Sequence, residues 1–344
     1  MKITQLMLAK GFGGAERYFI DLSLELADKG HQLQVICHRD FSEINRFIRK
    51  SGITVESFPV AGWWDEVSLR KMGKAINHFK PDVVHAHLAR GAYMAGKICL
   101  KSKTPLVVKT HNYVDLKYYK NVDAFITTTK DQQQYLIQEG IAPEKINVIP
   151  NFSRLPAIDT VSRHANDPLV IAACGRMVEK KGFHILLKAF KKVIESGAEV
   201  FLRLGGDGEE KNGLQHLCND LGINNHVEFY GWVDSVGAFL ENADIFVLPS
   251  LDEPFGIVVL EAMAKGKPLI STRTQGPSEI LDEETSYLVE TGSVDALANA
   301  LSIAVTDQDG RLKKAEKALC AFNNTYSENV VVPKIVQLYV RLTA

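Results

Sequence analysis

Short apolar runs alternate with longer amphipathic segments along the chain. In the first half, the apolar runs predict strands at Ile3–Leu8, Gln32–Cys37, Thr54–Pro59, Val83–His87, Leu106–Thr110, Ala124–Thr128 and Ile146–Ile149. Helical patterns lie between several of these strands, at Ala15–Lys29, Asp65–Phe79 and Asp131–Glu139. Strands that are apolar throughout and are separated by helices are typical of parallel sheets with helices on both faces.

The pattern breaks at residues 151–168, which have neither a helical nor a strand period. Polar residues lie there between Pro150 and Pro168, and this favours a linker. The alternation then resumes, with strands predicted at Val170–Cys174, Val200–Leu204, Val227–Tyr230, Ile245–Pro249 and Leu269–Ser271. We therefore expect an α/β chain of two Rossmann-like, doubly wound parallel-sheet domains, residues 1–150 and 169–329, facing a central cleft. A last amphipathic helix is expected within residues 330–344.

The densest group of candidate residues follows the predicted strand that ends at Pro249. A helix is expected to open near Pro254, because proline is favoured in a first helical turn, and to end at Gly266. Its first backbone amides have no partners within the helix and, with the helix dipole, form an anion site. These amides belong to Phe255, Gly256, Ile257 and Val258.

Two glutamates flank this anion site. Glu253 lies at its mouth, and Glu261 lies six residues beyond Phe255, about 9 Å along a helix. This separation suits a sugar nucleotide whose sugar meets Glu253, whose diphosphate meets the helix start and whose ribose meets Glu261. The alternative is that Glu253 is a capping residue and Glu261 a solvated helix residue.

Two further turns follow strands. In Gly175–Gly182, Arg176 and Lys181 can both reach a diphosphate, although loop cations are often merely solvated. After the first strand, Gly13 and Gly14 open a helix and let a ligand approach the backbone closely; the alternative is a tight turn. The stretch resembles a dinucleotide fingerprint but has Glu16 at the last required position, which disfavours an NAD(P)-dependent oxidoreductase.

Histidines mark the ends of two predicted strands. His85 and His87 alternate on one strand and therefore face the same side, and His111 follows the next strand. His85 fits a structural histidine, whereas His111 is the better candidate for touching substrate. The His-x-His pair has no evident third metal ligand, and the pair Asp307 and Asp309 falls in an expected polar loop. We therefore expect no metal and no other cofactor.

Composition adds a localisation and a charge asymmetry. No apolar stretch reaches the roughly 18 residues that cross a bilayer, and the first residues lack the features of a signal peptide, so a cytoplasmic protein is expected. The net charge of −1 divides into +6 for residues 1–160 (22 basic, 16 acidic) and −7 for the remainder (18 basic, 25 acidic). A basic first half favours peripheral contact with an anionic membrane, although unequal surface charge between domains is common. The exposed candidates for such contact are Trp63, Trp64, Lys71 and Lys74.

Together these motifs resemble, in order, the signature of the large bacterial family of retaining glycosyltransferases with the GT-B fold, the fourth family in the usual numbering. The resemblance covers about residues 1–305, and its Glu-x7-Glu block, Glu253 to Glu261, is the specific part. The other matching parts are Gly13-Gly14-Ala15-Glu16-Arg17, His85-Ala86-His87, Gly175-Arg176 and Lys181-Gly182.

The resemblance implies roles for these residues. Arg176 and Lys181 would bind the donor diphosphate, Glu261 the ribose and Glu253 the hydroxyls of the donor sugar. Amides of Gly256, Ile257 and Val258 would contribute, Gly13 and Gly14 would approach the phosphates, and His111 would lie near the reacting sugar. The final helix would cross back to the first domain.

The implied activity is metal-independent transfer of a sugar, with retention, from a nucleotide-diphosphate donor. A UDP-sugar is favoured as the donor, and a glycan or lipid-linked molecule in lipopolysaccharide, capsule or glycolipid synthesis is the expected acceptor. No nucleic-acid partner is expected. A nucleotide-sugar epimerase on the same fold and a non-catalytic glycan- or nucleotide-binding protein stay open as alternatives.

Overall fold

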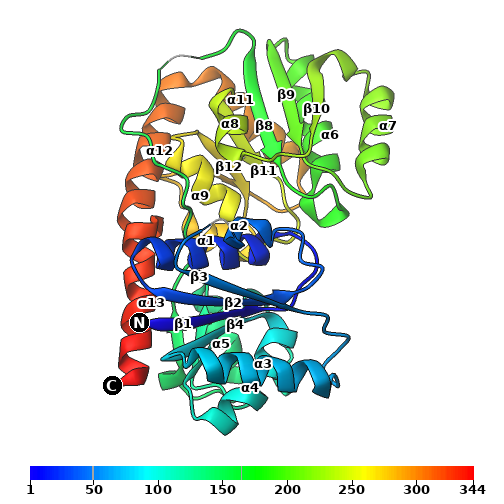
Figure 1. Ribbon diagram of the computed structural model, residues 1–344. Helices are drawn as coiled ribbons and strands as arrows, with labels where there is room; N and C mark the ends of the chain where they lie inside the picture. The colour runs from blue at the N-terminus through cyan, green and yellow to red at the C-terminus, as the bar shows by residue number, and fades with distance from the viewer. Residues whose placement is uncertain (49, 164) are drawn as a thin grey trace. The chain divides into compact units, whose positions relative to one another are not determined.

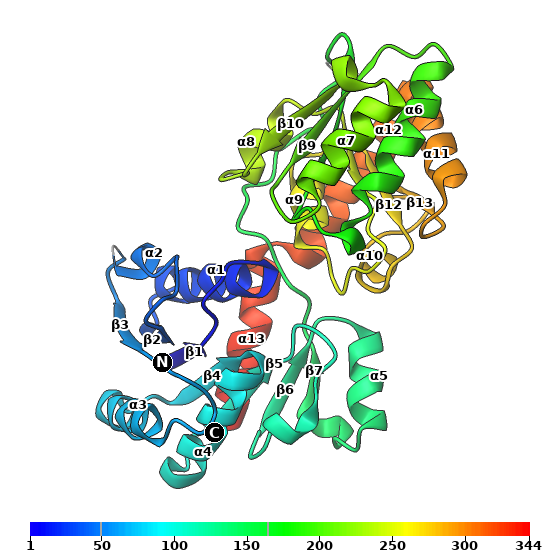
Figure 2. The same cartoon turned by 90° about the vertical axis from the view of Figure 1, so that its right-hand side faces the viewer.

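The computed structural model describes residues 1–48, 50–163 and 165–344, which form two compact units (Figures 1 and 2). The first unit comprises Met1–Phe152 and Glu328–Ala344, and the second comprises Ser153–Ser327. Residue 49, in the predicted first domain, and residue 164, in the predicted linker, lie outside the described residues.

The first unit contains a parallel sheet with the strand order β3-β2-β1-β4-β5-β6-β7. Its strands are β1 (Lys2–Met7), β2 (Gln32–His38), β3 (Ile53–Phe58), β4 (Val83–His87), β5 (Leu106–Lys109), β6 (Ala124–Thr127) and β7 (Ile146–Val148). Every strand predicted in the first half of the chain is therefore confirmed. The order of strands reverses between β1 and β4, so the loops that follow these two strands diverge, and ligands of doubly wound folds bind at such a point.

Helices cover both faces of this sheet. Helices α3 (Glu66–Phe79), α4 (Leu88–Ser102) and α5 (Lys130–Gln138) bury apolar side chains such as Met72 and Leu136 on one face. On the other face, α1 (Gly14–Asp28) and α2 (Asn45–Ile48) bury Phe19 and Phe47. The last helix, α13 (Glu328–Thr343), belongs to this unit and contacts α1 and β4 (Figure 1).

The second unit has the same doubly wound organisation, with the parallel strand order β10-β9-β8-β11-β12-β13. Its strands are β8 (Leu169–Cys174), β9 (Val200–Gly205), β10 (Val227–Gly231), β11 (Ile245–Leu248), β12 (Leu269–Thr272) and β13 (Tyr287–Val289). The reversal lies between β8 and β11. The two candidate donor loops, one after each of these strands, therefore diverge at the switch point of this sheet.

Two sets of helices sandwich the second sheet (Figure 2). One face packs against α6 (Phe183–Glu195), α7 (Lys211–Leu221) and α11 (Val294–Thr306). The other packs against α8 (Val236–Glu241), α9 (Ile257–Ala264) and α12 (Gln308–Ala321). Burying one large apolar side chain here stabilises the fold by roughly 1.5–3 kcal/mol.

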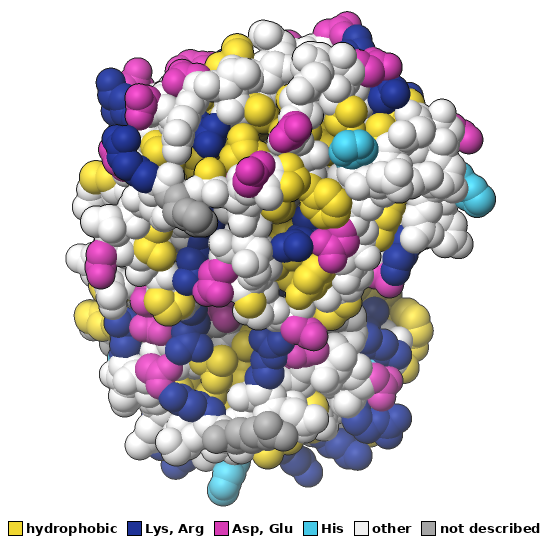
Figure 3. All heavy atoms as spheres, turned by 90° about the horizontal axis from the view of Figure 1, so that it is seen from above, with side chains coloured by type: hydrophobic (Ala, Val, Ile, Leu, Met, Phe, Trp, Pro, Cys, Tyr) yellow, Lys and Arg dark blue, Asp and Glu magenta, His cyan; other side chains and the backbone are white. Residues whose placement is uncertain are grey.

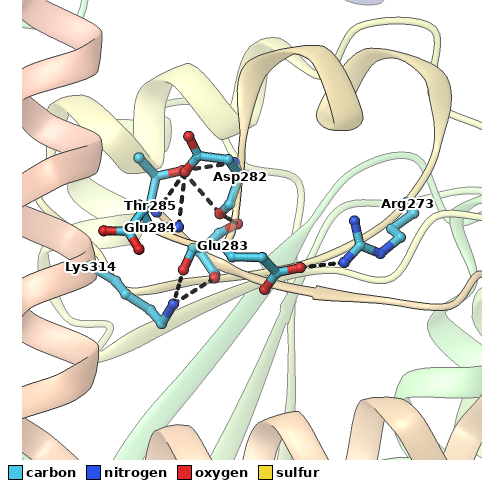
Figure 4. Close-up of polar contacts among 7 residues, drawn as sticks. Arg273, Asp282, Glu283, Glu284, Thr285 and Lys314 are labelled. Carbon is cyan, nitrogen blue, oxygen red and sulfur yellow. Dashed lines mark hydrogen bonds and ion pairs between the residues drawn. The ribbon is translucent and has the colours of Figure 1, made fainter.

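Strand β13 was not predicted, because three residues are too few to show a period. It pairs with β12 and follows a polar turn, shown in Figure 4, that connects it to α10 (Gln275–Ile280). In this turn, Asp282 Oδ1 accepts hydrogen bonds from the backbone amide and the hydroxyl of Thr285, both at 2.9 Å. Glu283 pairs with Arg273, and Lys314 Nζ donates to backbone carbonyls of the turn (Figure 4). Arg273, directly after β12, and Lys314, on α12, thus fix the turn that leads into β13.

The stretch predicted as a linker has no helix or strand among its described residues. Ser153 forms an isolated bridge with Ser327, so the chain passes between the units twice at adjacent positions. Farther along, the amide of Ile158 donates to the carbonyl of Ala264 at 3.0 Å, which ties the stretch to the second unit.

On the surface, basic and acidic side chains lie interspersed with apolar ones on the face drawn in Figure 3. Trp64 and Val67, near the start of α3, are 71% and 65% exposed. Among the described residues, no helix combines the length and the hydropathy needed to cross a bilayer.

Candidate active site

The loop after β8 is fixed by contacts with the loops of its neighbours. The amide of Gly175 donates to the carbonyl of Gly205 at 3.0 Å, and that of Met177 donates to the carbonyl of Asp207 at 2.8 Å. A single 3-10 turn, Glu179–Lys181, then leads to Gly182, whose φ of +66° lies in the left-handed region. A Cβ atom at Gly182 would lie 2.0 Å from the carbonyl oxygen of Pro249, so only glycine fits there.

This loop presents the two predicted cations. Arg176 is exposed, and its guanidinium forms no ion pair with the described residues. Lys181 folds back over Gly175, and its Nζ lies 2.5 Å from Oε2 of Glu253, on the loop after β11. The structure thus brings Lys181 and Glu253 together at the switch point of the second sheet, and Arg176 lies on the same loop as Lys181.

The loop after β11 differs from the prediction at one point. Helix α9 begins at Ile257 and not near Pro254, because Gly256 has a φ of +87° and interrupts the helical backbone. The preceding residue, Phe255, is buried, and a Cβ on Gly276 would lie 2.5 Å from its amide nitrogen. The backbone of Phe255 therefore packs closely against the start of α10, and its amide precedes the first turn of α9. Gly266 ends the helix as predicted, with a left-handed φ of +57°.

The later helix start also changes the position of Glu261. It lies four residues into α9, about 6 Å from its first residue, where about 9 Å was expected. Glu261 is 1% exposed, so the alternative of a solvated helix residue is wrong. Glu253 is 8% exposed, and its backbone carbonyl accepts from the amide of Gly276 at 3.0 Å. Ile257 and Val258 keep their places in the first turn of α9, as expected.

Two buried hydroxyls at this site were missed by the sequence analysis. Ser250 Oγ, on the loop after β11, and Thr274 Oγ1, directly before α10, are buried and have no hydrogen-bond partner in the structure. Buried polar groups without partners are rare in folded proteins, and they often mark a place where a ligand binds. The sequence signal was present: Thr274-Gln275-Gly276-Pro277 follows a predicted strand, as the other site loops do.

In the first unit, the three predicted histidines lie together. The rings of His85 and His87 stack with centroids 4.4 Å apart, which confirms that they face the same side. His87 Nδ1 lies 3.1 Å from Nε2 of His111. His111 is 7% exposed and has a φ of +62°, unusual for a residue with a side chain.

Burial keeps these imidazoles neutral. Desolvation lowers the pKa of His85 to about 3 and holds the pKa of His87 and of His111 well below the ordinary value. Lys109, fully buried beside them, also has a pKa well below its ordinary value because of desolvation. Its Nζ donates to the carbonyl of Ile149 at 3.1 Å and lies 4.4 Å from the ring centroid of Tyr18. Lys109 was not predicted from the sequence as part of this cluster.

The glycine pair opens α1. Gly13 is its N-cap and has an extended backbone, while Gly14 is its first residue. A Cβ on Gly14 would meet no atom within 4 Å, so close packing does not account for this glycine. The Asp307 and Asp309 pair has structural roles instead: Asp307 caps α12 by accepting from the amide of Gly310, and Asp309 pairs with Arg163.

Two family profiles match the chain and nearly fill it. The profile described as Glycosyltransferase Family 4 matches residues 12–153, and that described as Glycosyl transferases group 1 matches residues 156–319. The lipopolysaccharide core biosynthesis glycosyltransferase LpsE of Rhizobium meliloti is 32% identical over 98% of both chains. The chain therefore belongs to the glycosyltransferase family that these two profiles describe.

Further relatives agree with this assignment. A UDP-Gal:alpha-D-GlcNAc-diphosphoundecaprenol alpha-1,3-galactosyltransferase of Escherichia coli is 27% identical over 99% of this chain and 97% of its own. The crystal structure of Anabaena Alr3699/HepE in complex with UDP and glucose has a TM-score of 0.82 at 21% identity, covering 99% of this chain and 100% of that chain. The glycosyltransferase therefore has the GT-B fold, with a doubly wound parallel sheet in each unit.

Proposed function

We propose that this glycosyltransferase transfers a sugar from a UDP-sugar, with retention and without a divalent metal, to a glycan or lipid-linked acceptor in lipopolysaccharide or glycolipid synthesis. The names of LpsE and of the galactosyltransferase relative support the pathway and the nucleotide. The observation that carries the proposal is the ion pair of Lys181 with Glu253 at the switch point of the second sheet. It joins the loop after β8, which also carries Arg176, to the loop that leads into α9.

The diphosphate of the donor binds at this group. The guanidinium of Arg176 grips the phosphates bidentately, and Lys181 contributes a point charge. The amides at the start of α9, those of Ile257 and Val258 with that of Gly256, add donors and the positive end of the helix dipole. Glu253 then accepts from hydroxyls of the donor sugar, and Glu261 from hydroxyls of the ribose.

The same groups lower the barrier to transfer. When the bond from the anomeric carbon to the phosphate oxygen breaks, positive charge develops on the sugar and negative charge on the departing UDP. Donors fixed in place before the reaction stabilise that negative charge, and each is typically worth roughly 3–4 kcal/mol. The acceptor oxygen forms the new bond on the face from which UDP departs, and its proton passes to the departing phosphate.

The residues of the first unit keep their predicted roles in this proposal. His111 contacts the reacting sugar, and Gly13 and Gly14 contact the phosphates. Gly14 has open space around it, which supports a ligand-facing role.

Contact with a membrane surface is the second part of the proposal. Trp63 stacks on Tyr118, with ring centroids 4.2 Å apart, and the next residue, Trp64, is 71% exposed. Lys117 lies over the ring of Tyr118, 4.8 Å from its centroid. A fixed aromatic group next to a lysine suits the interface of an anionic bilayer. This arrangement supports an acceptor that is held at a membrane.

Product analysis tests the proposed reaction. The protein is incubated in EDTA with UDP-, GDP- and ADP-sugars and lipid-linked acceptors, and the new anomeric centre is assigned by NMR. We expect UDP release coupled to transfer, with the donor's anomeric configuration retained. An inverted product contradicts retention, and loss of turnover in EDTA that magnesium restores contradicts metal independence. Conversion of the donor without any acceptor identifies an epimerase, and donor binding without turnover identifies a non-catalytic protein.

A further inference from the structure

A chain of hydrogen bonds runs through the buried interior of the first unit and ends at His111. His87 lies between His111 and Gln5. Nδ1 of His87 lies 3.1 Å from His111 Nε2, and Nε2 of His87 lies 2.9 Å from Oε1 of Gln5 on β1. The side-chain nitrogen Nε2 of Gln5 donates in turn to the hydroxyl of Tyr339 on α13, at 3.4 Å. That hydroxyl lies 2.6 Å from Nδ1 of His85.

Each imidazole in this chain carries a single proton, because burial holds the pKa of all three histidines far below neutrality. A neutral imidazole has one nitrogen that donates and one that accepts. In each ring, the hydrogen-bond partner of one nitrogen therefore determines whether the proton lies on that nitrogen or on the other one.

Gln5 determines the direction of the chain. Its Oε1 is only an acceptor, so the proton of His87 must lie on Nε2. His87 Nδ1 then accepts, and the proton of His111 must lie on Nε2, the atom that faces it. Nδ1 of His111 is therefore unprotonated.

Packing keeps these rings in place. The ring of Tyr18 meets that of His111 edge to face, with centroids 5.4 Å apart, and Phe19 meets His87 in the same manner at 5.3 Å. Gln5, His85 and His87 are all 0% exposed. A rotated ring would lose both its hydrogen bonds and these contacts.

We propose that Gln5 and His87 are positioning residues that hold His111 with its proton on Nε2, so that Nδ1 accepts a hydrogen bond from a substrate hydroxyl. This inference rests on the proposed contact of His111 with the reacting sugar. A hydroxyl held in this way must point its hydrogen toward His111 and keep its lone pairs for other donors. Gln5 and Tyr339 are thus linked to sugar recognition although they lie one and two hydrogen bonds behind His87.

The tautomers are tested by long-range ¹H–¹⁵N NMR of the full chain, selectively labelled at histidine, which separates protonated from unprotonated ring nitrogens. His111→Asn and His87→Asn assign the signals. We expect protonated Nε2 and unprotonated Nδ1 for both residues in the unliganded protein. A protonated Nδ1 on either residue overturns the proposal. The spectrum needs no substrate, so it stays decisive even if the proposed sugar transfer is wrong.

Gln5→Leu then removes the residue that sets the direction of the chain. Gln34→Leu is the matched control, because Gln34 is also 0% exposed, lies on the adjacent strand β2 and bonds to Thr4 and Glu56. We expect Gln5→Leu to mix the His111 tautomers and to lower kcat about 10-fold relative to Gln34→Leu, the worth of roughly one hydrogen bond. Unchanged His111 signals in Gln5→Leu, or equal kcat in the two leucine variants, overturn the positioning role.

Discussion

Lys181 and Glu253 form an ion pair, with Nζ 2.5 Å from Oε2, that joins the loop after β8 to the loop after β11. Their side chains are 22% and 10% exposed, so water screens the pair only in part. A diphosphate that binds beside Lys181 competes with Glu253 for the ammonium. We therefore expect Glu253 to turn from Lys181 to the donor sugar when the donor binds.

Replacing Lys181 tests its contact with the departing phosphate. Lys181→Ala is expected to lower kcat/KM about 100- to 1000-fold, because one preorganised donor is lost. Lys180→Ala is the matched control: Lys180 is the neighbouring lysine, and it pairs with Asp252 at 3.5 Å on the exposed surface. Steady-state kinetics on both variants should leave the control near the wild-type rate. Equal losses in both variants would show that Lys181 has no special role.

Removing the charge of Glu253 should separate binding from turnover. In Glu253→Gln, UDP no longer competes with a carboxylate for Lys181, so its affinity should rise by up to about 5-fold, as expected for one partly screened ion pair. The transfer rate should fall, because the carboxylate that accepts from the sugar is gone. Calorimetry and single-turnover kinetics measure the two effects. Weaker UDP binding together with a normal rate would contradict the competition.

Gly182→Ala should disturb the donor loop more than a similar change elsewhere. Both Gly182 and Gly197 have positive φ values, but a Cβ on Gly197 would meet no atom within 4 Å. Gly197→Ala should cost about 1–2 kcal/mol of unfolding free energy, for the backbone alone. Gly182→Ala should cost about 1–3 kcal/mol more, because its Cβ meets the Pro249 carbonyl. Urea denaturation measures the unfolding free energy of both variants. Equal decreases would mean that the loop of Gly182 does not contact the Pro249 carbonyl.

The buried histidines make stability depend on pH. Below about pH 6.5 the unfolded chain binds protons at His85, His87 and His111 that the folded chain does not bind. The free energy of unfolding therefore decreases as the pH is lowered. For His85 the loss continues down to about pH 3, where the folded state also protonates. His85→Gln should make the curve shallower by up to about 1.4 kcal/mol per pH unit in this window. Urea titrations at several pH values test this, and identical slopes for the two proteins would contradict neutral burial.

Membrane contact predicts a local effect of the exposed tryptophans. The double variant Trp63→Ser/Trp64→Ser should reduce binding to vesicles that contain anionic lipid, at low salt, by about 10-fold or more. Trp232→Ser, which changes a tryptophan of the second unit that is 56% exposed, is the control. Vesicle sedimentation measures both. Equal binding by the two variants would contradict membrane contact through Trp63 and Trp64.

Much of the fold could be predicted because central strands such as β8 and β11 are largely buried and are apolar throughout. Strand β13 could not, since its three residues depend on pairing with β12 and on the turn around Asp282. The start of α9 was placed near Pro254 from local preference alone. In the structure, Gly256 has a left-handed φ of +87° that interrupts the helical backbone, so the helix starts at Ile257.

The candidate site divides in the same way. Arg176, Lys181 and Glu253 could be found because each follows a strand end, and parallel strands bring such ends to one edge of a sheet. The partners of the histidines could not, because Gln5 and Tyr339 are 334 residues apart in sequence and meet only in the folded unit. The burial of Lys109 and Glu261 was likewise invisible, since a charged residue in a sequence is normally read as exposed.

The most direct test of the diphosphate site is calorimetric titration of UDP and of uridine, in EDTA, into the wild-type protein and Arg176→Ala/Lys181→Ala. We predict that UDP binds the wild-type protein without a metal and binds the double variant at least about 100-fold more weakly, whereas uridine binds both proteins equally. Equal affinity of UDP for the two proteins, or binding of UDP only when magnesium is added, would contradict the account.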